Sequence, residues 1–483
     1  MRIRYGSLAA ATMLTMSATA ALPTVSNIAL SQNDDTRLVT ITYTLTGDTP
    51  AIVTADILTN GVSVGSVGAL SGDINKLITP TGGICTAYWQ PRVDLPEVVL
   101  DPNAVTAKLT VWDRVCPPDY MAVDLTVSNS LSFYPNAEAV PGGVTNRRYK
   151  TDVLLMRKIP AAGAEFIMGT PVNKNGAGRT ELGRFDNELT PHAVTMTNDY
   201  YMGIFELTYR QFRRVMSGNP NWWGYTNGAV AASVDVDVLP VTGFRHYQWR
   251  VRSGTSTNEL PNYKICWPRS GHQIVETDGA YFVKFRAFTG LELDYPTEAQ
   301  WEFACRAGCP TALYNGKEIT NTTASATLDD IAWYAGNWDK DANACVLLDG
   351  KKGPHEVGLL KPNAFGLYDM LGNVFEFCLE PSSTSMTGFG GNESNGADEV
   401  EPVGYCVPTS CNTRHFMRSS AFSSGARGVR AGRRLSINNT SSGASTNLDE
   451  SASPDFNGAG GNTGVRFVCP ASIPVPANAV EGE

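Results

Sequence analysis

The chain has 483 residues, of which 42% are hydrophobic and 18% charged, and its formal net charge is −9. The length predicts two or three domains, and the hydrophobic content excludes a mostly disordered chain. The acidic balance, without a large basic surface run, argues against a nucleic-acid partner.

The first 21 residues have the pattern of a secretory signal peptide. Arg2 and Arg4 precede a short apolar run at 8–16, and the small residues 18–20 are typical of a cleavage site. The apolar run is too short to cross a bilayer, and no other long apolar run follows. We therefore expect an exported protein, secreted, periplasmic or at the cell surface, without a transmembrane span.

Residues 22–140 predict an all-β domain. Runs such as 38–45 and 121–127 alternate apolar or β-branched residues with polar ones, and Asn60-Gly61 is a hairpin signal. Several short strands separated by turns indicate an immunoglobulin- or fibronectin-like sandwich. A spacer or adhesion role is expected for such a block.

The rest of the chain divides by composition. Pro141, Gly142 and Gly143 indicate a linker. The predicted divisions after the β block are a linker at 141–150, a larger domain at 151–471 and a tail at 472–483.

Three helices are predicted in the larger domain. Thr208 with Gln211, and Thr297 with Gln300, have the spacing of a capping box, in which each threonine caps a helix. Residues 279–288 are a further helix candidate. After these helices the pattern changes to turns, short strands and glycine-rich loops.

Ten cysteines, an even number in an exported chain, predict disulfides. Cys85 and Cys116 are alone in the first third of the chain, so we expect them to pair. Cys305 and Cys309 lack the paired spacing and the nearby histidines of a zinc site. The pairing of the remaining cysteines is left open by the sequence.

Residues 361–380 have an unusual composition. They combine a turn, four aromatics, Gly366 and Gly372, and the carboxylates of Asp369 and Glu376. The glycines interrupt any regular helix. We expect a compact loop and strand with buried aromatics and converging oxygens.

Five segments, in this order, resemble the formylglycine-generating enzyme family, also called the sulfatase-modifying factor family. They are residues 165–169, 206–212, 295–308, 362–378 and 464–467. The resemblance implies a C-type-lectin-like domain with little regular secondary structure. An N-terminal β-sandwich before such a domain is familiar in secreted bacterial members. The expected fold class is therefore α+β, with an all-β sandwich followed by this domain.

Active members of the family hold copper on a pair of cysteines and convert a sulfatase cysteine to formylglycine. Cu(I) requires soft thiolates, but the matching positions here are Ser424 and, approximately, Ala426. We therefore expect a non-catalytic binding or scaffold protein. Cys406 and Cys411 have the spacing of the copper pair, so an active oxidase with a relocated pair is the alternative. A surface-display protein with variable loops at 422–463 is a third possibility.

The resemblance also implies a structural calcium site within residues 361–380. By position, its ligands are the side chains of Asp369 and Glu376 and the carbonyls of Gly372 and Val374. Hard oxygens of this kind suit Ca²⁺. In the alternative, the two carboxylates only cap turns.

Arg427, Arg430, Arg433 and Arg434 form the only dense basic cluster in the sequence. Arginine binds carboxylate and sulfate groups bidentately, so Arg427, Arg430 and Arg434 are candidates for ligand binding. Internal salt bridges are the favoured alternative. The expected partner is a peptide, glycan or protein outside the cytoplasm, and copper is expected only if the protein is catalytic.

Overall fold

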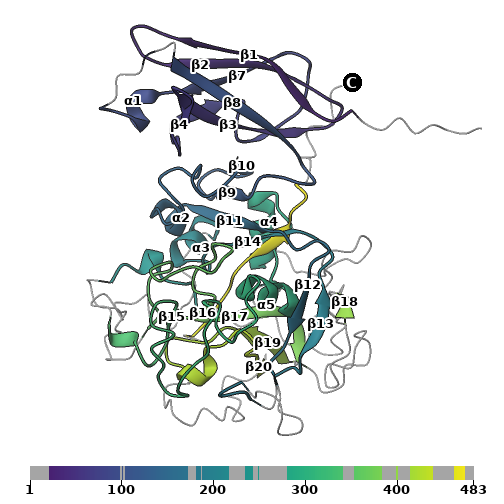
Figure 1. Ribbon diagram of the computed structural model, residues 1–483, viewed down its shortest axis with the longest axis vertical. Helices are drawn as coiled ribbons and strands as arrows, with labels where there is room; N and C mark the ends of the chain where they lie inside the picture. The colour runs from purple at the N-terminus through teal and green to yellow at the C-terminus, as the bar shows by residue number, and fades with distance from the viewer. Residues whose placement is uncertain are drawn as a thin grey trace, which may run out of the picture.

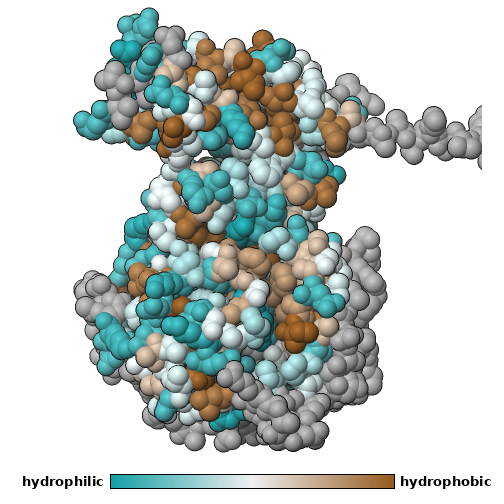
Figure 2. Space-filling model, in the orientation of Figure 1, coloured by the Kyte–Doolittle hydropathy of each residue, from teal (hydrophilic) through white to brown (hydrophobic). Residues whose placement is uncertain are grey.

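The structure is a computed structural model. It describes residues 21–97, 101, 104–171, 181–185, 188–216, 234–242, 249, 280–340, 353–382, 399–400, 414–438 and 462–473. Within these ranges strands outnumber helices, and no helix has both the length and the apolar character needed to cross a bilayer. Two lobes are in contact, a smaller N-terminal one and a larger one (Figures 1 and 2).

The N-terminal lobe contains two antiparallel sheets. The first has the order β1-β2-β7-β5, namely β1 (Thr24–Gln32), β2 (Val39–Thr46), β7 (Ile84–Trp89) and β5 (Leu70–Gly72). The second contains β4 (Val62–Ser63), β3 (Ala51–Thr59), β6 (Leu77–Ile78) and, paired with β3, β8 (Val105–Asp113). A short helix, α1 (Pro91–Asp94), follows β7.

Alternation along the strands builds a core between these sheets. In β2 every second residue is buried, so Ile41 and Tyr43 face inward. Val53 of β3 and Trp89 of β7 belong to the same buried cluster. Asn60 and Gly61 form the turn between β3 and β4, with positive φ values of 50° and 78°. The two strands pair antiparallel on either side of this turn, which confirms the predicted hairpin.

The predicted disulfide between Cys85 and Cys116 is wrong, because both thiols are free. Cys85 lies on β7 opposite Tyr43, where burial raises the pKa of its thiol. Cys116 is exposed, and its Sγ lies 4.0 Å from Nζ of Lys158 in the other lobe. The described cysteines form no disulfide; Cys266, Cys345, Cys406 and Cys411 lie outside the described residues.

The larger lobe is built on a five-stranded sheet of order β10-β9-β11-β14-β22. Its strands are β10 (Ser130–Tyr134), β9 (Tyr120–Asp124), β11 (Val153–Ile159), β14 (Tyr200–Gly203) and β22 (Val468–Pro470). The strand predicted at 121–127 for the β-sandwich is therefore in the other lobe, because its residues pair with β11.

The two lobes share an apolar contact. Ile52 of β3 is fully buried in the core of the larger lobe, and the Phe133 amide donates to the Asn75 carbonyl at 2.8 Å. Residues 141–150, predicted as a linker, pack closely: Tyr149 is 1% exposed and its hydroxyl donates to the Pro141 carbonyl. This segment leads into α2 (Arg148–Thr151).

All three predicted helices are present. They are α3 (Tyr209–Val215), α4 (Tyr281–Thr289) and α5 (Glu298–Arg306). Both capping boxes are complete. The hydroxyls of Thr208 and Thr297 each accept from the backbone amide of the glutamine three residues on, and the backbone amide of each threonine donates to the side-chain oxygen of that glutamine.

Short strands and single turns make up the rest of the larger lobe. The first of three small sheets contains β12 (Glu165–Met168), β13 (His192–Thr195) and β18 (Glu399–Val400). The second contains β15 (Ala332–Trp333) and β16 (Leu371–Gly372). The third has the order β20 (Leu435–Asn438), β19 (Arg414–Arg418), β17 (Phe375–Ser382) and β21 (Thr463–Gly464). The 3₁₀ turns are η2 (Val236–Val238), η5 (Trp338–Lys340) and η6 (Ala426–Gly428). In Figure 1, β17 and β19 lie beside α5.

Gly372 provides a test of how tightly residues 361–380 are packed. It has φ +84°, and a Cβ there would lie 2.3 Å from the Trp333 carbonyl oxygen, whereas Gly308 has the same φ and open space. We expect Gly308→Ala to lower the free energy of unfolding by about 1–3 kcal/mol, the cost of a left-handed backbone. Gly372→Ala should cost clearly more, as measured by urea unfolding. Equal costs would contradict the close contact.

Candidate functional site

A buried network of ion pairs joins α5 to β19. The i, i+4 spacing places Glu298 and Glu302 on one face of α5, one turn apart. Arg418, fully buried, donates from Nε to Glu298 Oε1 and from Nη1 to Glu302 Oε2, both at 2.7 Å. Arg306 pairs with Glu302, and Arg434 with Glu298. The helix thus presents its carboxylates to arginines from two other segments.

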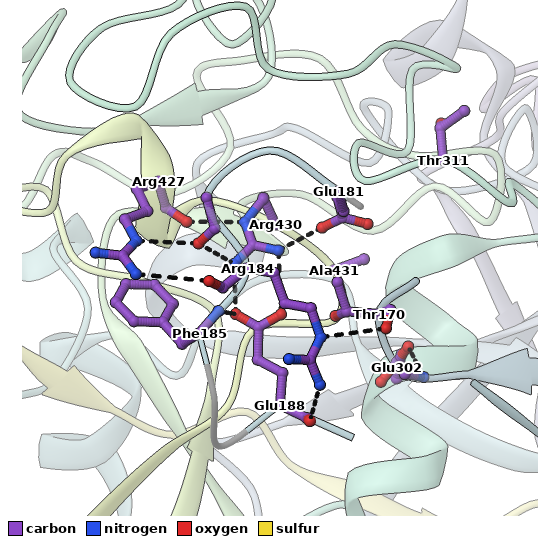
Figure 3. A network of polar contacts seen from close by, with 12 residues as sticks. Thr170, Glu181, Arg184, Phe185, Glu188, Glu302, Thr311, Arg427, Arg430 and Ala431 are labelled. Atoms are coloured by element: carbon purple, nitrogen blue, oxygen red, sulfur yellow. Dashed lines mark hydrogen bonds and ion pairs between the residues drawn. The ribbon is translucent and has the colours of Figure 1, made fainter. Parts of the chain in front are cut away.

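Arg430 is the centre of a second set of contacts, drawn in Figure 3. It is fully buried and pairs with both Glu181 and Glu188. Burial raises the pKa of Glu181, although the Arg430 charge opposes this shift. Beside this pair, the guanidinium carbons of Arg427 and Arg433 lie 3.8 and 3.7 Å from the centroid of the Phe185 ring.

These contacts limit the ligand-binding role predicted for the arginine run. The charges of Arg430 and Arg434 are neutralised inside the protein, which is the internal salt-bridge alternative. An outside carboxylate or sulfate would have to displace a buried glutamate from either one, at a high cost in free energy. Arg427 differs, because its side chain is half-buried and bonds to backbone carbonyls.

The residues predicted to bind calcium lie near a third fully buried arginine, Arg466. Glu376, on β17, is fully buried and receives hydrogen bonds from Arg466 Nη2 at 2.8 Å and Trp301 Nε1 at 2.7 Å. Both of its oxygens therefore have donors. The Gly372 carbonyl accepts from the Ser419 hydroxyl at 3.1 Å.

Asp369 has a different environment. It is 2% exposed with φ +55°, and Oδ2 accepts the Gly358 amide at 2.6 Å. Oδ1 is buried without a hydrogen-bond partner. Burial raises the pKa of this carboxyl to about 6, opposed by the Gly358 hydrogen bond and by Arg466.

Sequence reasoning missed a third carboxylate here, Glu206. It is fully buried and accepts from the Asn373 side chain at 2.7 Å and from the Val374 amide at 3.3 Å. Burial, with the charges of Asp369 and Glu376, raises its pKa well above the ordinary value. Its place as the first residue of the family-like segment 206–212 is the signal that could have found it.

At Asp369, the buried Oδ1 has no hydrogen-bond partner, so this oxygen is of the type that a hard cation takes as a ligand. No group of three or more His, Cys, Asp or Glu side chains within the described residues could hold a metal ion. A calcium ion would therefore need the carbonyls of Gly372 and Val374 beside the two carboxylates. It would also compete with Arg466 and Trp301 for Glu376.

The positions that match the copper cysteines carry no thiol. Ser424 is 3% exposed, and its hydroxyl accepts the Ala421 amide at 3.2 Å. Ala426 is buried at the start of η6. Cys406 and Cys411, the alternative pair, lie outside the described residues.

Glu302 gives a test of the network through pH. Burial alone would raise its pKa, but Arg306 and Arg418 lower it below the ordinary value of 4.5. Its stabilising contribution is therefore present above pH 4.5 and is lost as pH falls through the lower folded pKa. We expect Glu302→Gln to lower the free energy of unfolding by about 3–5 kcal/mol at pH 7, and by less in acid. A pH-independent difference would contradict the ion pairs, and Glu165→Gln, at an exposed position of β12, is the control.

Comparison with known proteins gives the family. A family model described as sulfatase-modifying factor enzyme 1-like domain matches residues 163–458, more than half of the chain. The chaperone protein LppX of Paenibacillus barcinonensis is 26% identical over 205 residues, which are 39% of this chain and 64% of LppX. The formylglycine-generating enzyme of Mus musculus is 24% identical over 246 residues, 46% of this chain and 58% of that enzyme.

Further matches are shorter or structural. The formylglycine-generating enzyme of Thermomonospora curvata is 32% identical over 128 residues, 26% of this chain and 36% of that enzyme. The solved structure of PvdO from Pseudomonas aeruginosa is 19% identical with a TM-score of 0.40, covering 66% of this chain and 94% of PvdO. The chain spans less than two thirds of the length of LppX and of the mouse enzyme. On the family match, the chain belongs to the formylglycine-generating enzyme, or sulfatase-modifying factor, family.

Proposed function

We propose that this protein is an exported, non-catalytic member of its family that binds a peptide, glycan or protein outside the cytoplasm. The observation that carries the proposal is the chemistry at Ser424 and Ala426. A hydroxyl engaged with a backbone amide and a buried methyl group offer no ligand to Cu(I), which takes thiolates.

Two further observations support a binding role. LppX, a relative in the comparisons, carries the name of a chaperone rather than of an enzyme. The two N-terminal sheets with a shared core suit the immunoglobulin- or fibronectin-like sandwich of a spacer or adhesion module. A signal peptide over residues 1–21 would place both lobes outside the cytoplasm.

The alternative is an active oxidase that uses Cys406 and Cys411. To test it, the purified full chain is loaded with Cu(I) and incubated in air with a cysteine peptide of a sulfatase. We expect no stoichiometric copper and an aldehyde yield equal to that of a protein-free blank. An active formylglycine-generating enzyme is the positive control. Aldehyde formation that disappears in the Cys406→Ser/Cys411→Ser variant would overturn the non-catalytic proposal.

A structural calcium ion held by Asp369, Glu376 and the carbonyls of Gly372 and Val374 is part of the proposal. It is supported by the orphaned Oδ1 of Asp369. Bound calcium would compensate the buried carboxylates and fix the turn before β17.

Calcium addition tests this site through stability. An ion at 100 times its Kd stabilises the folded state by about 2.7 kcal/mol, so Tm should rise by several degrees over the chelated protein. Asp369→Asn should lose most of that shift. Asp330→Asn, at an exposed aspartate paired with Lys361, is the control and should keep it. An unchanged Tm in the wild type, or the same shift in Asp369→Asn, would contradict the site.

A further inference from the structure

The buried network beside α5 is balanced in charge among the residues that pair within it. Four arginines meet four glutamates, and each has at least one partner of opposite sign. They are Arg306, Arg418, Arg430, Arg434, Glu181, Glu188, Glu298 and Glu302. Within the described residues, an arginine beside this network that has no ion pair therefore adds net positive charge.

Two arginines next to the network add such charge. Arg184 donates to the carbonyls of Glu188 at 2.7 Å and Thr170 at 3.4 Å, and Arg427 to those of Gly183 at 3.1 Å and Arg184 at 3.5 Å. Within the described residues neither has an ion pair. Carbonyl oxygens orient a guanidinium group but do not neutralise it.

Phe185 fixes the second of these arginines. The Arg427 guanidinium carbon lies 3.8 Å from the ring centroid, the distance of a close cation–π stack. The Phe185 ring is itself only 8% exposed, so it is a rigid support. Arg427 is already held by the ring and by the carbonyls. Binding a ligand would therefore cost little conformational entropy of the Arg427 side chain.

The surface at this point is both cationic and apolar. Arg184 and Arg427 are half-buried, and Leu182, in the same segment, is 45% exposed. Figure 3 shows Arg184, Phe185 and Arg427 close together beside the Arg430 pairs. We call Leu182, Arg184, Phe185 and Arg427 the arginine–phenyl surface.

We propose that the arginine–phenyl surface binds the carboxylates of an acidic peptide segment of a partner protein. This inference rests on the proposed binding function and names the chemistry of its ligand. Each planar guanidinium fork matches a carboxylate, and the exposed Leu182 favours a segment in which Asp or Glu adjoins an apolar residue. A sulfated glycan would use the cations but leave Leu182 without a contact.

The test is calorimetric titration of the full chain with the peptide acetyl-Leu-Glu-Glu-Leu-amide, and with the same peptide carrying glutamine in place of glutamate. We expect binding of the acidic peptide only. Arg184→Gln/Arg427→Gln should weaken it about tenfold or more, because two charged hydrogen-bond donors are lost. Arg148→Gln, at an exposed arginine of α2, should leave the affinity unchanged.

Three results would overturn the inference: no binding of the acidic peptide, equal binding of both peptides, or unchanged affinity in the double variant. If a sulfated disaccharide binds more tightly than the acidic peptide, and this binding is lost in the double variant, the ligand of the surface is a glycan and the peptide proposal is wrong. If the glutamine variant does not fold, the variant Arg184→Lys/Arg427→Lys takes its place in the titration. It keeps both charges but loses the planar guanidinium groups, so it should also bind the acidic peptide more weakly than the wild type does. The aldehyde assay described above is run on the same preparation. If no peptide binds and no aldehyde forms, this site is wrong but the non-catalytic proposal stands; if aldehyde forms, the non-catalytic proposal itself is wrong.

Discussion

Buried arginines hold the larger lobe together. Arg418, Arg430 and Arg466 are each fully buried, and each reaches glutamates supplied by an earlier segment of the chain. A guanidinium group is stable away from water only when it is paired, so these contacts fix the geometry of the segments they join. In a lobe made largely of two- to five-residue strands, they substitute for long helices and broad sheets.

This constraint shapes what the molecule can do. Arg466 pairs with Glu376 and donates to the carbonyls of Gly203 and Tyr368, so residues 361–380 are tied to the central sheet. Residues 361–380 are therefore held in place by hydrogen bonds and an ion pair. The positions that match the copper cysteines, Ser424 and Ala426, carry a hydroxyl and a methyl group. Among the described residues, Arg184 and Arg427 bond to backbone carbonyls and form no ion pair, and the proposed acidic-peptide site rests on these two arginines.

The local signals in the sequence were sufficient for the regular elements. Capping boxes at Thr208 and Thr297 and the turn at Asn60-Gly61 depend on neighbouring residues, and all three are present. Partners distant in sequence could not be read in the same way. Nothing local indicates that the segment at 121–127 pairs with β11, or that Glu206 joins Asp369 across more than a hundred residues. The Cys85–Cys116 pair was inferred from the isolation of these two cysteines in the sequence, and both thiols are free.

A double-mutant cycle between Arg418 and Glu302 tests the central claim most directly. The free energy of unfolding at pH 7 is measured for the full chain, Arg418→Met, Glu302→Gln and the double variant. If the buried pair fixes α5 against β19, the coupling energy should be about 1–3 kcal/mol, because each single variant removes one of the two ion pairs of the buried charge that remains. A coupling energy within about 0.5 kcal/mol of zero, as exposed pairs give, would contradict the account.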